Sequence, residues 1–232
     1  MLVEVIVQND QEAVEAEKLG AGRLELVSAI NEGGLTPSYG TIKRVLESVS
    51  IPVQVMIRPH SRNFFCSEPE LETILEDVRN VLDLGGYGIV FGALNKDGTV
   101  DEKALERIIQ LSGNLDITFH RAFDEIGHQL EAYRVLNKYK NHVKRILTSG
   151  GQSDCLNGKE KLKSLVQLSR DLEGPSILCG GGLTADNLKE VHQTVNSTEY
   201  HFGRGVREDE SFASGFKSEA FERITELGRE RA

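Results

Sequence analysis

The sequence predicts a closed (β/α)8 barrel of the TIM type, an α/β fold formed here by a single domain over residues 1–232. Apolar strand-like runs alternate with helix-like segments eight times, and the strand starts are roughly 20 to 35 residues apart. Polar and glycine residues gather after the strands and hardly ever before them. A length of 232 residues suits one barrel. The alternative, a doubly wound open sheet, normally has fewer strands and no reason to stop at eight.

The expected elements follow one another as β/α units. Asn9 or Asp10 caps the first helix, because a short polar side chain can accept from the free N–H groups of the first turn. In the second unit Thr36 is the expected N-cap and Pro37 the first helical residue. The expected strands are residues 2–7, 23–28, 53–57, 87–91, 115–119, 143–147, 176–178 and 199–202. The expected helices are residues 11–19, 37–48, 68–84, 101–111, 130–138, 159–172, 187–195 and 219–228.

Composition and charge argue against several classes of partner. The formal net charge of −9 works against binding to nucleic acid or to anionic membranes. The first residues lack a basic leader and carry Glu4 at their centre, which favours a strand over a signal peptide. No run approaches the roughly 20 apolar residues of a membrane span. Three widely separated cysteines give no disulfide framework, so we expect a cytoplasmic protein.

Glycine loops follow each of the last three strands and predict an anion-binding site. Glycine lets backbone N–H groups approach an anion closely, and the loops after strands seven and eight are the common phosphate site of this barrel. The same glycines can also serve only to form tight turns. The expected anion-binding residues are Ser149, Gly150, Gly151, Gly181, Gly182 and Gly203.

A second polar group follows the fifth strand and consists of His120, Arg121 and Asp124. An imidazole can act as acid, base or metal ligand, and a guanidinium holds a carboxylate or a phosphate in a fork. A histidine in a strand is often a core residue with satisfied hydrogen bonds, but a place at the strand end favours a functional role.

Two glutamates stand on strands that should be buried, Glu4 and Glu25. A buried carboxyl group must be paired or protonated, and Arg58 is the expected cationic partner. A structural ion-pair network and a functional group explain these residues equally well. His201, on the last strand, has weaker support as a site residue.

A copper site is the other chemistry that the residues allow. Cys179 ends the seventh strand, where it is expected to face the site, and Cys66 lies in the loop after the third strand. Two thiolates, or thiolates with histidines, would suit Cu(I). Free cysteine is also among the most commonly buried residues, and the chain has no C-x-x-C motif.

Several short motifs resemble those of the CutC family of copper homeostasis proteins, and they reach to about Gly182. The motifs are EGGLTPS at 32–38, IRP at 57–59, FFCS at 64–67, LEDV at 75–78, TFHRAFD at 118–124 and LTSGG at 147–151. The resemblance implies a cytoplasmic TIM-type barrel, usually a homo-oligomer, that is associated with copper tolerance and copper binding. It implies no settled enzymatic reaction.

Two functional hypotheses remain. The first is a cytoplasmic copper homeostasis protein that binds a copper ion through Cys66 and Cys179. The second is an enzyme of the lyase or isomerase type that acts on a small phosphorylated or carboxylated metabolite. Its expected catalytic residues are Glu25, Arg58, His120 and Arg121.

Overall fold

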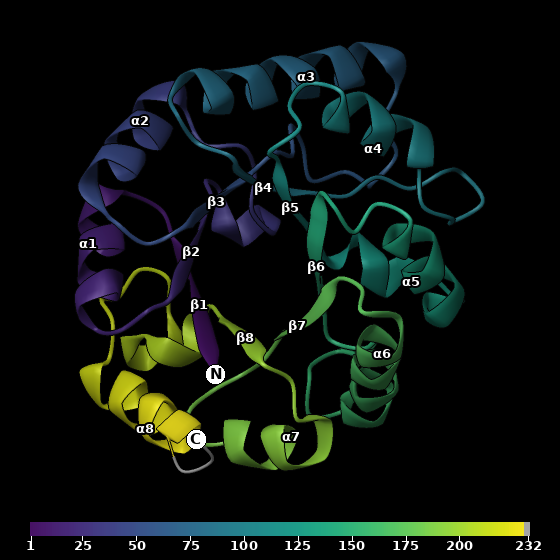
Figure 1. Ribbon diagram of the computed structural model, residues 1–232. Helices are drawn as coiled ribbons and strands as arrows, with labels where there is room; N and C mark the ends of the chain where they lie inside the picture. Colours follow the sequence, from purple (N-terminus) through teal and green to yellow (C-terminus); the bar gives the residue numbers. More distant parts are fainter. Residues whose placement is uncertain (230–232) are drawn as a thin grey trace.

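The computed structural model describes residues 1–229 and shows a closed barrel of parallel strands within a ring of helices (Figure 1). Each strand pairs with the next, and β1 pairs with β8 to close the barrel. The strands are β1 (Leu2–Val7), β2 (Arg23–Leu26), β3 (Val53–Met56), β4 (Gly88–Phe91), β5 (Asp116–Phe119), β6 (Val143–Thr148), β7 (Ser176–Gly180) and β8 (Glu199–Phe202). The predicted fold class is confirmed.

Across the residues that the structure describes, one α-helix follows each strand. The helices are α1 (Asp10–Lys18), α2 (Tyr39–Ser48), α3 (Glu68–Asp83), α4 (Glu102–Ile109), α5 (Gln129–Asn137), α6 (Lys159–Leu172), α7 (Leu188–Val195) and α8 (Ser218–Arg229). Four 3-10 helices lie in loops that follow strands: η1 (Ile30–Glu32), η2 (Arg121–Glu125), η3 (Arg204–Val206) and η4 (Glu208–Glu210). Within residues 1–229, no helix is both long enough and apolar enough to cross a membrane.

The helix starts agree with the sequence at α1 and differ at α2. The side chain of Asn9 accepts from the N–H of Glu12 at 2.9 Å, as expected of an N-cap. The prediction of Thr36 as the cap of α2 is wrong, because Ser38 caps that helix. Thr36 is engaged elsewhere: its hydroxyl accepts from the N–H of Arg58 at 2.9 Å. It therefore ties the loop after β2 to the end of β3.

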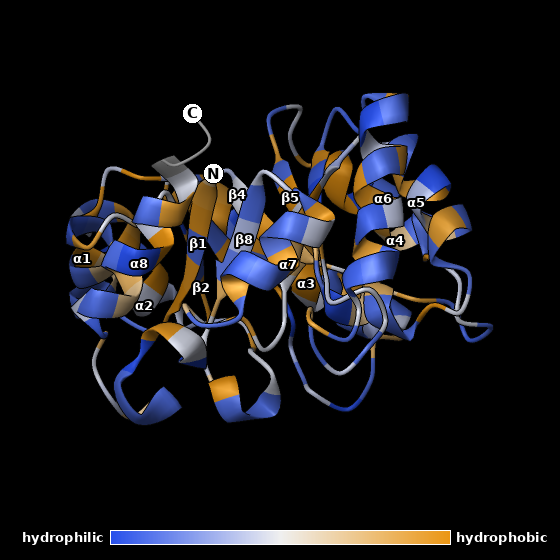
Figure 2. Ribbon diagram, turned by 90° about the horizontal axis from the view of Figure 1, so that it is seen from below, coloured by the Kyte–Doolittle hydropathy of each residue, from blue (hydrophilic) through white to orange (hydrophobic). Residues whose placement is uncertain are grey.

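Side chains alternate between two environments along each strand. Val5, Leu24 and Phe119 point outward and pack in the large apolar core between barrel and helices. In Figure 2, β1 is mostly hydrophobic, whereas the visible outer sides of α6 and α7 are mostly hydrophilic. The inward-facing apolar side chains form a smaller cluster of Ile6, Val27, Met56 and Val90.

The inside of the barrel near the strand starts holds a network of charged side chains. Arg23 pairs with Glu4 and, at 2.6 Å, with Glu199. Arg145 pairs with Asp116 at 2.6 Å and lies 3.5 Å from Glu199. Buried charges are tolerated where each has a partner of opposite sign, and these residues satisfy that condition. This network fills the amino-terminal end of the barrel, and the carboxyl ends of the strands lie at the other end.

Candidate functional site

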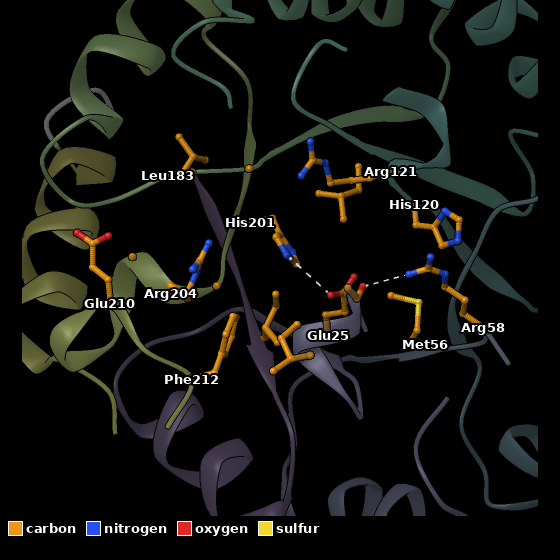
Figure 3. A pocket seen from close by; sticks show the side chains of 18 of the residues that line it. Glu25, Met56, Arg58, His120, Arg121, Leu183, His201, Arg204, Glu210 and Phe212 are labelled. Atoms are coloured by element: carbon orange, nitrogen blue, oxygen red, sulfur yellow. Dashed lines mark hydrogen bonds and ion pairs between the residues drawn. The ribbon is translucent and has the colours of Figure 1, made fainter. Parts of the chain in front are cut away.

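A cavity of about 400 Å³ opens at the carboxyl ends of the strands, a size typical of small-molecule sites (Figure 3). Apolar side chains form part of its wall, among them Ile6, Met56, Phe64, Leu147 and Phe212. The polar side chains that line it are Glu25, Arg58, His120, Arg121, His201, Arg204 and Glu210. All four residues expected to be catalytic, Glu25, Arg58, His120 and Arg121, are thus brought to one cavity.

The floor of the cavity carries an imidazole between two carboxyl groups. Nδ1 of His201 lies 2.8 Å from Oε1 of Glu4, and Nε2 of the same ring lies 3.8 Å from Oε2 of Glu25. Glu4 is paired on its other side with Arg23. The sequence suggested Arg58 as the partner of both glutamates, and this is wrong, because Glu4 pairs with Arg23 and Glu25 lies beside His201. Arg23 takes that place because Glu4 and Arg23 are opposite each other in the β1–β2 register.

The two glutamates differ strongly in acidity. Burial raises the pKa of Glu4, but Arg23 and His201 outweigh it and hold that pKa at about 2. Burial raises the pKa of Glu25 to about 7, and the neighbouring charge of Glu4 adds to the effect. Burial lowers the pKa of His201, whereas Glu25 and Glu4 raise it above its ordinary value. Glu25 can therefore take up and release a proton near neutral pH.

Glu25 also has a carboxylate oxygen that receives no hydrogen bond from the described part of the protein. Its side chain is almost completely buried, and its Oε1 atom has no hydrogen-bond partner among residues 1–229. A buried polar atom without a partner costs roughly 1–3 kcal/mol. Glu25 lines the cavity, so this atom lies next to the space that a ligand would occupy (Figure 3).

His120 lines another side of the cavity as a neutral imidazole. Burial, and then the charge of Arg58, lower its pKa to about 3. Its Nδ1 atom accepts from the N–H of Ala122 at 3.1 Å, so Nε2 carries the ring proton. The ring of Phe64 lies against it, with 5.0 Å between the ring centroids.

Three arginines surround the same space. Arg58 is half-buried, and its guanidinium lies over the ring of Phe64 at 4.8 Å from the centroid. Arg121 donates to Asp124 at 2.7 Å and to the hydroxyl of Ser149 at 2.8 Å. Arg204 is exposed and lies in the loop after β8. Together they favour an anionic ligand.

The glycine loop after β6 does not serve the cavity. Ser149, Gly150 and Gly151 are not among the residues that line it. The N–H groups of Ser149 and Gly151 donate to the carboxylate of Asp124, at 3.1 and 3.0 Å. The loop does bind an anionic group through its backbone N–H groups, but that group is the carboxylate of Asp124 and not a ligand. The assignment of these three residues to a ligand site is therefore corrected.

The loops after β7 and β8 do reach the cavity, which Gly181, Gly182 and Gly203 line. Gly181 has a φ of +125°, and an added Cβ would lie 3.1 Å from the Cβ of Ser149. A larger residue there would be strained in its backbone and would press on Ser149, and its Cβ would contact Cζ of Arg121 at 3.5 Å. These glycines keep the wall of the cavity open beside a cation.

The two expected copper ligands are not assembled into one site. Cys179 points outward into the apolar core, and burial raises its pKa to about 12. Cys66 does not line the cavity at the carboxyl ends of the strands, called the mouth cavity below. Burial together with nearby acidic groups raises the pKa of Cys66 to about 11. The expectation that Cys179 faces the site is wrong, since Cys179 is on the outward side of β7.

One group of side chains in residues 1–229 has the spacing of metal ligands, with donor atoms of Glu4, Glu25 and His201 within 4.8 Å of one another. It offers no sulfur, whereas thiolate and thioether ligands select Cu(I). Glu4 is already engaged by Arg23 and by His201. This donor set does not fit Cu(I). Its two carboxyl groups and imidazole have the chemistry of an acid–base group.

Sequence reasoning undervalued His201 and overlooked Arg23. The alternation of side chains along a strand was the available signal, because Arg23 is two residues before Glu25 and must share its face. The pairing of β1 with β8, which brings Glu4 to His201, is a long-range contact that no local pattern indicates.

The fold and the cavity define a TIM-barrel protein with acid, base and cationic groups at the barrel mouth. The model of the CutC family matches residues 1–206. A relative from Mesorhizobium japonicum, described as a family protein CutC, is 39% identical over 201 residues, which are 87% of this chain and 76% of the relative. The chain belongs to the CutC family.

Solved structures agree with this assignment. A CutC protein from Streptococcus agalactiae, named for copper homeostasis, is 30% identical, with a TM-score of 0.80 over 88% of this chain and 98% of that one. The phosphoribosyl anthranilate isomerase of Thermotoga maritima has a TM-score of 0.64 at 16% identity, over 99% of this chain and 100% of the other. The second similarity concerns the fold alone.

Proposed function

We propose that this CutC-family protein is an enzyme of the lyase or isomerase type that binds a small phosphorylated or carboxylated metabolite at the barrel mouth. The observation that carries the proposal is Glu25, a buried carboxyl group with a pKa of about 7 and an oxygen without a partner among residues 1–229. Groups with strongly shifted pKa values cluster at functional sites.

The charges of the lining side chains suggest a separate role for each of them. Arg58, Arg121 and Arg204 hold the anionic part of the ligand, and Gly181 and Gly182 let it approach the backbone. Glu25 transfers the proton, since a general base works best when its pKa is near the working pH. Glu4 fixes the orientation of His201, which in turn faces Glu25.

Covalent catalysis is not part of the proposal. Among the lining residues that the structure describes there is no lysine, cysteine, serine or threonine. A Schiff base needs a lysine, and the common acyl-enzyme intermediates need a serine, cysteine or threonine. The side chains that remain are suited to proton transfer and to the binding of charge.

Thermal shift with a panel of small phosphates and carboxylates tests the proposal. A ligand at 100 times its dissociation constant stabilises the native state by about 2.7 kcal/mol, which raises the Tm measurably. We expect Arg58→Met and Arg204→Met to weaken the response, and Arg134→Met, an exposed position on α5, to leave it unchanged. A flat response across the whole panel would contradict the proposal.

Copper binding is a second candidate function, supported by the name of the Streptococcus agalactiae relative. One structural observation favours a specific position: Cys66 and His60 line the same small cavity next to the mouth. Nδ1 of His60 is buried and has no hydrogen-bond partner within residues 1–229. A thiol with a pKa of about 11 must lose its proton to the metal, so binding would weaken as the pH falls.

Anaerobic Cu(I) titration against a competing chelator tests this candidate. If it is correct, Cys66→Ser and His60→Ala weaken binding, and Cys179→Ser, which removes a thiol from the apolar core, does not. Equal affinity of the parent and of Cys66→Ser would exclude Cys66 as a ligand.

We also expect the protein to act in the cytoplasm as a homo-oligomer. The three cysteines are free thiols, which supports a reducing compartment. Light scattering after size-exclusion chromatography measures the oligomeric state, and a single species with the mass of one chain would contradict the expectation.

A further inference from the structure

We infer that the ligand of the mouth cavity is an α-hydroxy carbonyl compound with an anionic group, and that His120 donates a hydrogen bond to its carbonyl oxygen while Glu25 moves a proton between its carbons. The inference rests on the proposed function and narrows its substrate class.

The first observation is the state of His120. Its Nδ1 atom is used by the N–H of Ala122, so the ring presents an N–H donor at Nε2. The ring is buried beside Arg58, and both effects disfavour a second proton. A neutral imidazole that keeps its donor across the physiological pH range can polarise a carbonyl group. Triosephosphate isomerase pairs a neutral histidine with a glutamate base for this purpose.

The second observation is the position of the base. Glu25 lies on β2 and His120 comes directly after β5, so the two groups reach the cavity from different parts of the strand ring. In Figure 3 they lie on different sides of the cavity, with Met56 and Arg58 near His120. A ligand between them would contact both, with its anionic group toward Arg121, Arg204 and the glycines after β7.

The third observation is what the lining lacks. The residues described around the cavity offer carboxylate, imidazole and guanidinium groups and no other reactive side chain. A base together with a donor for a developing oxyanion is what the removal of a proton next to a carbonyl group requires. The hydroxyl group on the neighbouring carbon lets the same two residues complete an isomerisation.

The proton transfer balances without any further reactant. Glu25 removes the proton from the carbon that bears the hydroxyl group, and that C–H electron pair becomes the C=C bond of an enediolate. The π electron pair of the carbonyl moves to its oxygen, which accepts from Nε2–H of His120. Glu25 then returns the proton to the former carbonyl carbon, and the hydroxyl proton passes to the former carbonyl oxygen.

Hydrogen exchange in D2O tests the inference. The probes are aldose and ketose phosphates of three to six carbons, hydroxy keto acids, and the sugar alcohol phosphates that lack the carbonyl group. We expect the NMR signal of the C–H next to the carbonyl of one probe to disappear in the presence of the protein. Glu25→Gln should slow this exchange by roughly 100-fold or more.

The role of His120 needs a readout that a purely structural role would not change. His120→Gln should slow exchange by about 100-fold, the cost of losing one oxyanion donor, while binding of the sugar alcohol phosphate is kept. His128→Gln, at an exposed histidine before α5, should leave both unchanged. Loss of exchange and of alcohol binding together in His120→Gln would overturn the assigned role.

The failure of the inference is distinguishable from that of the proposed function. If phosphates or carboxylates bind in an Arg204-dependent way but no hydroxy carbonyl probe exchanges, the substrate class is wrong and the anionic site stands. If no probe of any class binds, the proposed function itself is overturned.

Discussion

Nδ1 of His201 lies 2.8 Å from Oε1 of Glu4, although the two residues are 197 positions apart in the chain. The contact joins the first strand of the barrel to the last. Because Glu4 stays ionised, it holds a proton on Nδ1 and turns Nε2 toward Glu25. The orientation of the imidazole is therefore set by a residue that does not line the mouth cavity.

Glu25 should make the protein less stable as the pH rises. Its folded pKa of about 7 is above the ordinary value of 4.5, so between these two pH values the unfolded chain has lost a proton that the folded chain still holds. The free energy of unfolding falls across this window and the loss is complete above it. Glu25→Gln removes the titration, and at pH 8 it should be more stable than the parent by roughly 1–3 kcal/mol.

Urea unfolding at pH 4.5 and pH 8 measures this difference. The gain from Glu25→Gln should appear at the higher pH and nearly vanish at the lower one. Glu15→Gln, an exposed position on α1, is the matched control and should show no such dependence. An equal effect of Glu25→Gln at both pH values would show that ionisation of Glu25 is not the cause.

The pKa values of the two histidines of the cavity should be shifted in opposite directions from the ordinary value. His120, with its pKa lowered to about 3, should remain neutral at pH 5, and it costs stability as the pH falls below 6.5 toward 3. The raised pKa of His201 means that it contributes stability below 6.5, which is lost as the pH rises through its folded pKa. Long-range ¹⁵N–¹H correlation spectra report both states, with His120→Gln and His201→Asn for assignment. A charged His120 at pH 5 would contradict the structure.

Arg23 should be the most sensitive charged residue of the barrel interior. Arg23→Met removes the arginine that pairs with both Glu4 and Glu199. It leaves them only His201 and Arg145 as ionic partners within residues 1–229, and the loss of one member of a buried pair costs about 3–5 kcal/mol. Urea denaturation measures the loss. Arg44→Met removes a pair with Asp10 in which the arginine is 70% exposed, and it should cost far less stability than Arg23→Met. Similar losses of stability in the two variants would show that the buried pairs of Arg23 contribute no more than an exposed pair.

Asp124 should control the order of the glycine loop after β6. Asp124→Ala removes the acceptor of the N–H groups of Ser149 and Gly151, so both should exchange with solvent about 10-fold faster or more. Hydrogen exchange followed by NMR measures this, and the amide of Ile146 in the preceding strand should keep its rate. Unchanged protection of Ser149 and Gly151 would show that the loop does not depend on the carboxylate.

The strand and helix order could be predicted from the sequence because each β/α unit carries its own local signals. The capping of α1 by Asn9 is one of them. The capping of α2 could not be predicted in the same way, since Thr36 is drawn away by a hydrogen bond to the N–H of Arg58, a contact with the next strand. Local sequence therefore determines which residue caps a helix only where no tertiary contact competes for that side chain.

The residues of the site were identified better than their partners. Polar residues after strands indicate the mouth of a parallel barrel, which is why His120 could be identified from the sequence. Glu25 could be identified because a carboxyl group on a buried strand must be paired or protonated. In such strands both faces are buried, so hydropathy does not tell the inward from the outward face. The inward placement of Cys179 was wrong for this reason. The pairing of Glu4 with Arg23 depends on the register of β1 and β2, which the sequence does not display.

The contact between β1 and β8 has a consequence for the order of events during synthesis. Glu4 and Glu25 leave the ribosome early, and His201 is among the last core residues to follow. Until the eighth strand docks, Glu4 and Glu25 lack their imidazole partner. A nascent chain can therefore form its earlier β/α units before these three side chains meet, and the cluster is complete only when the ring closes.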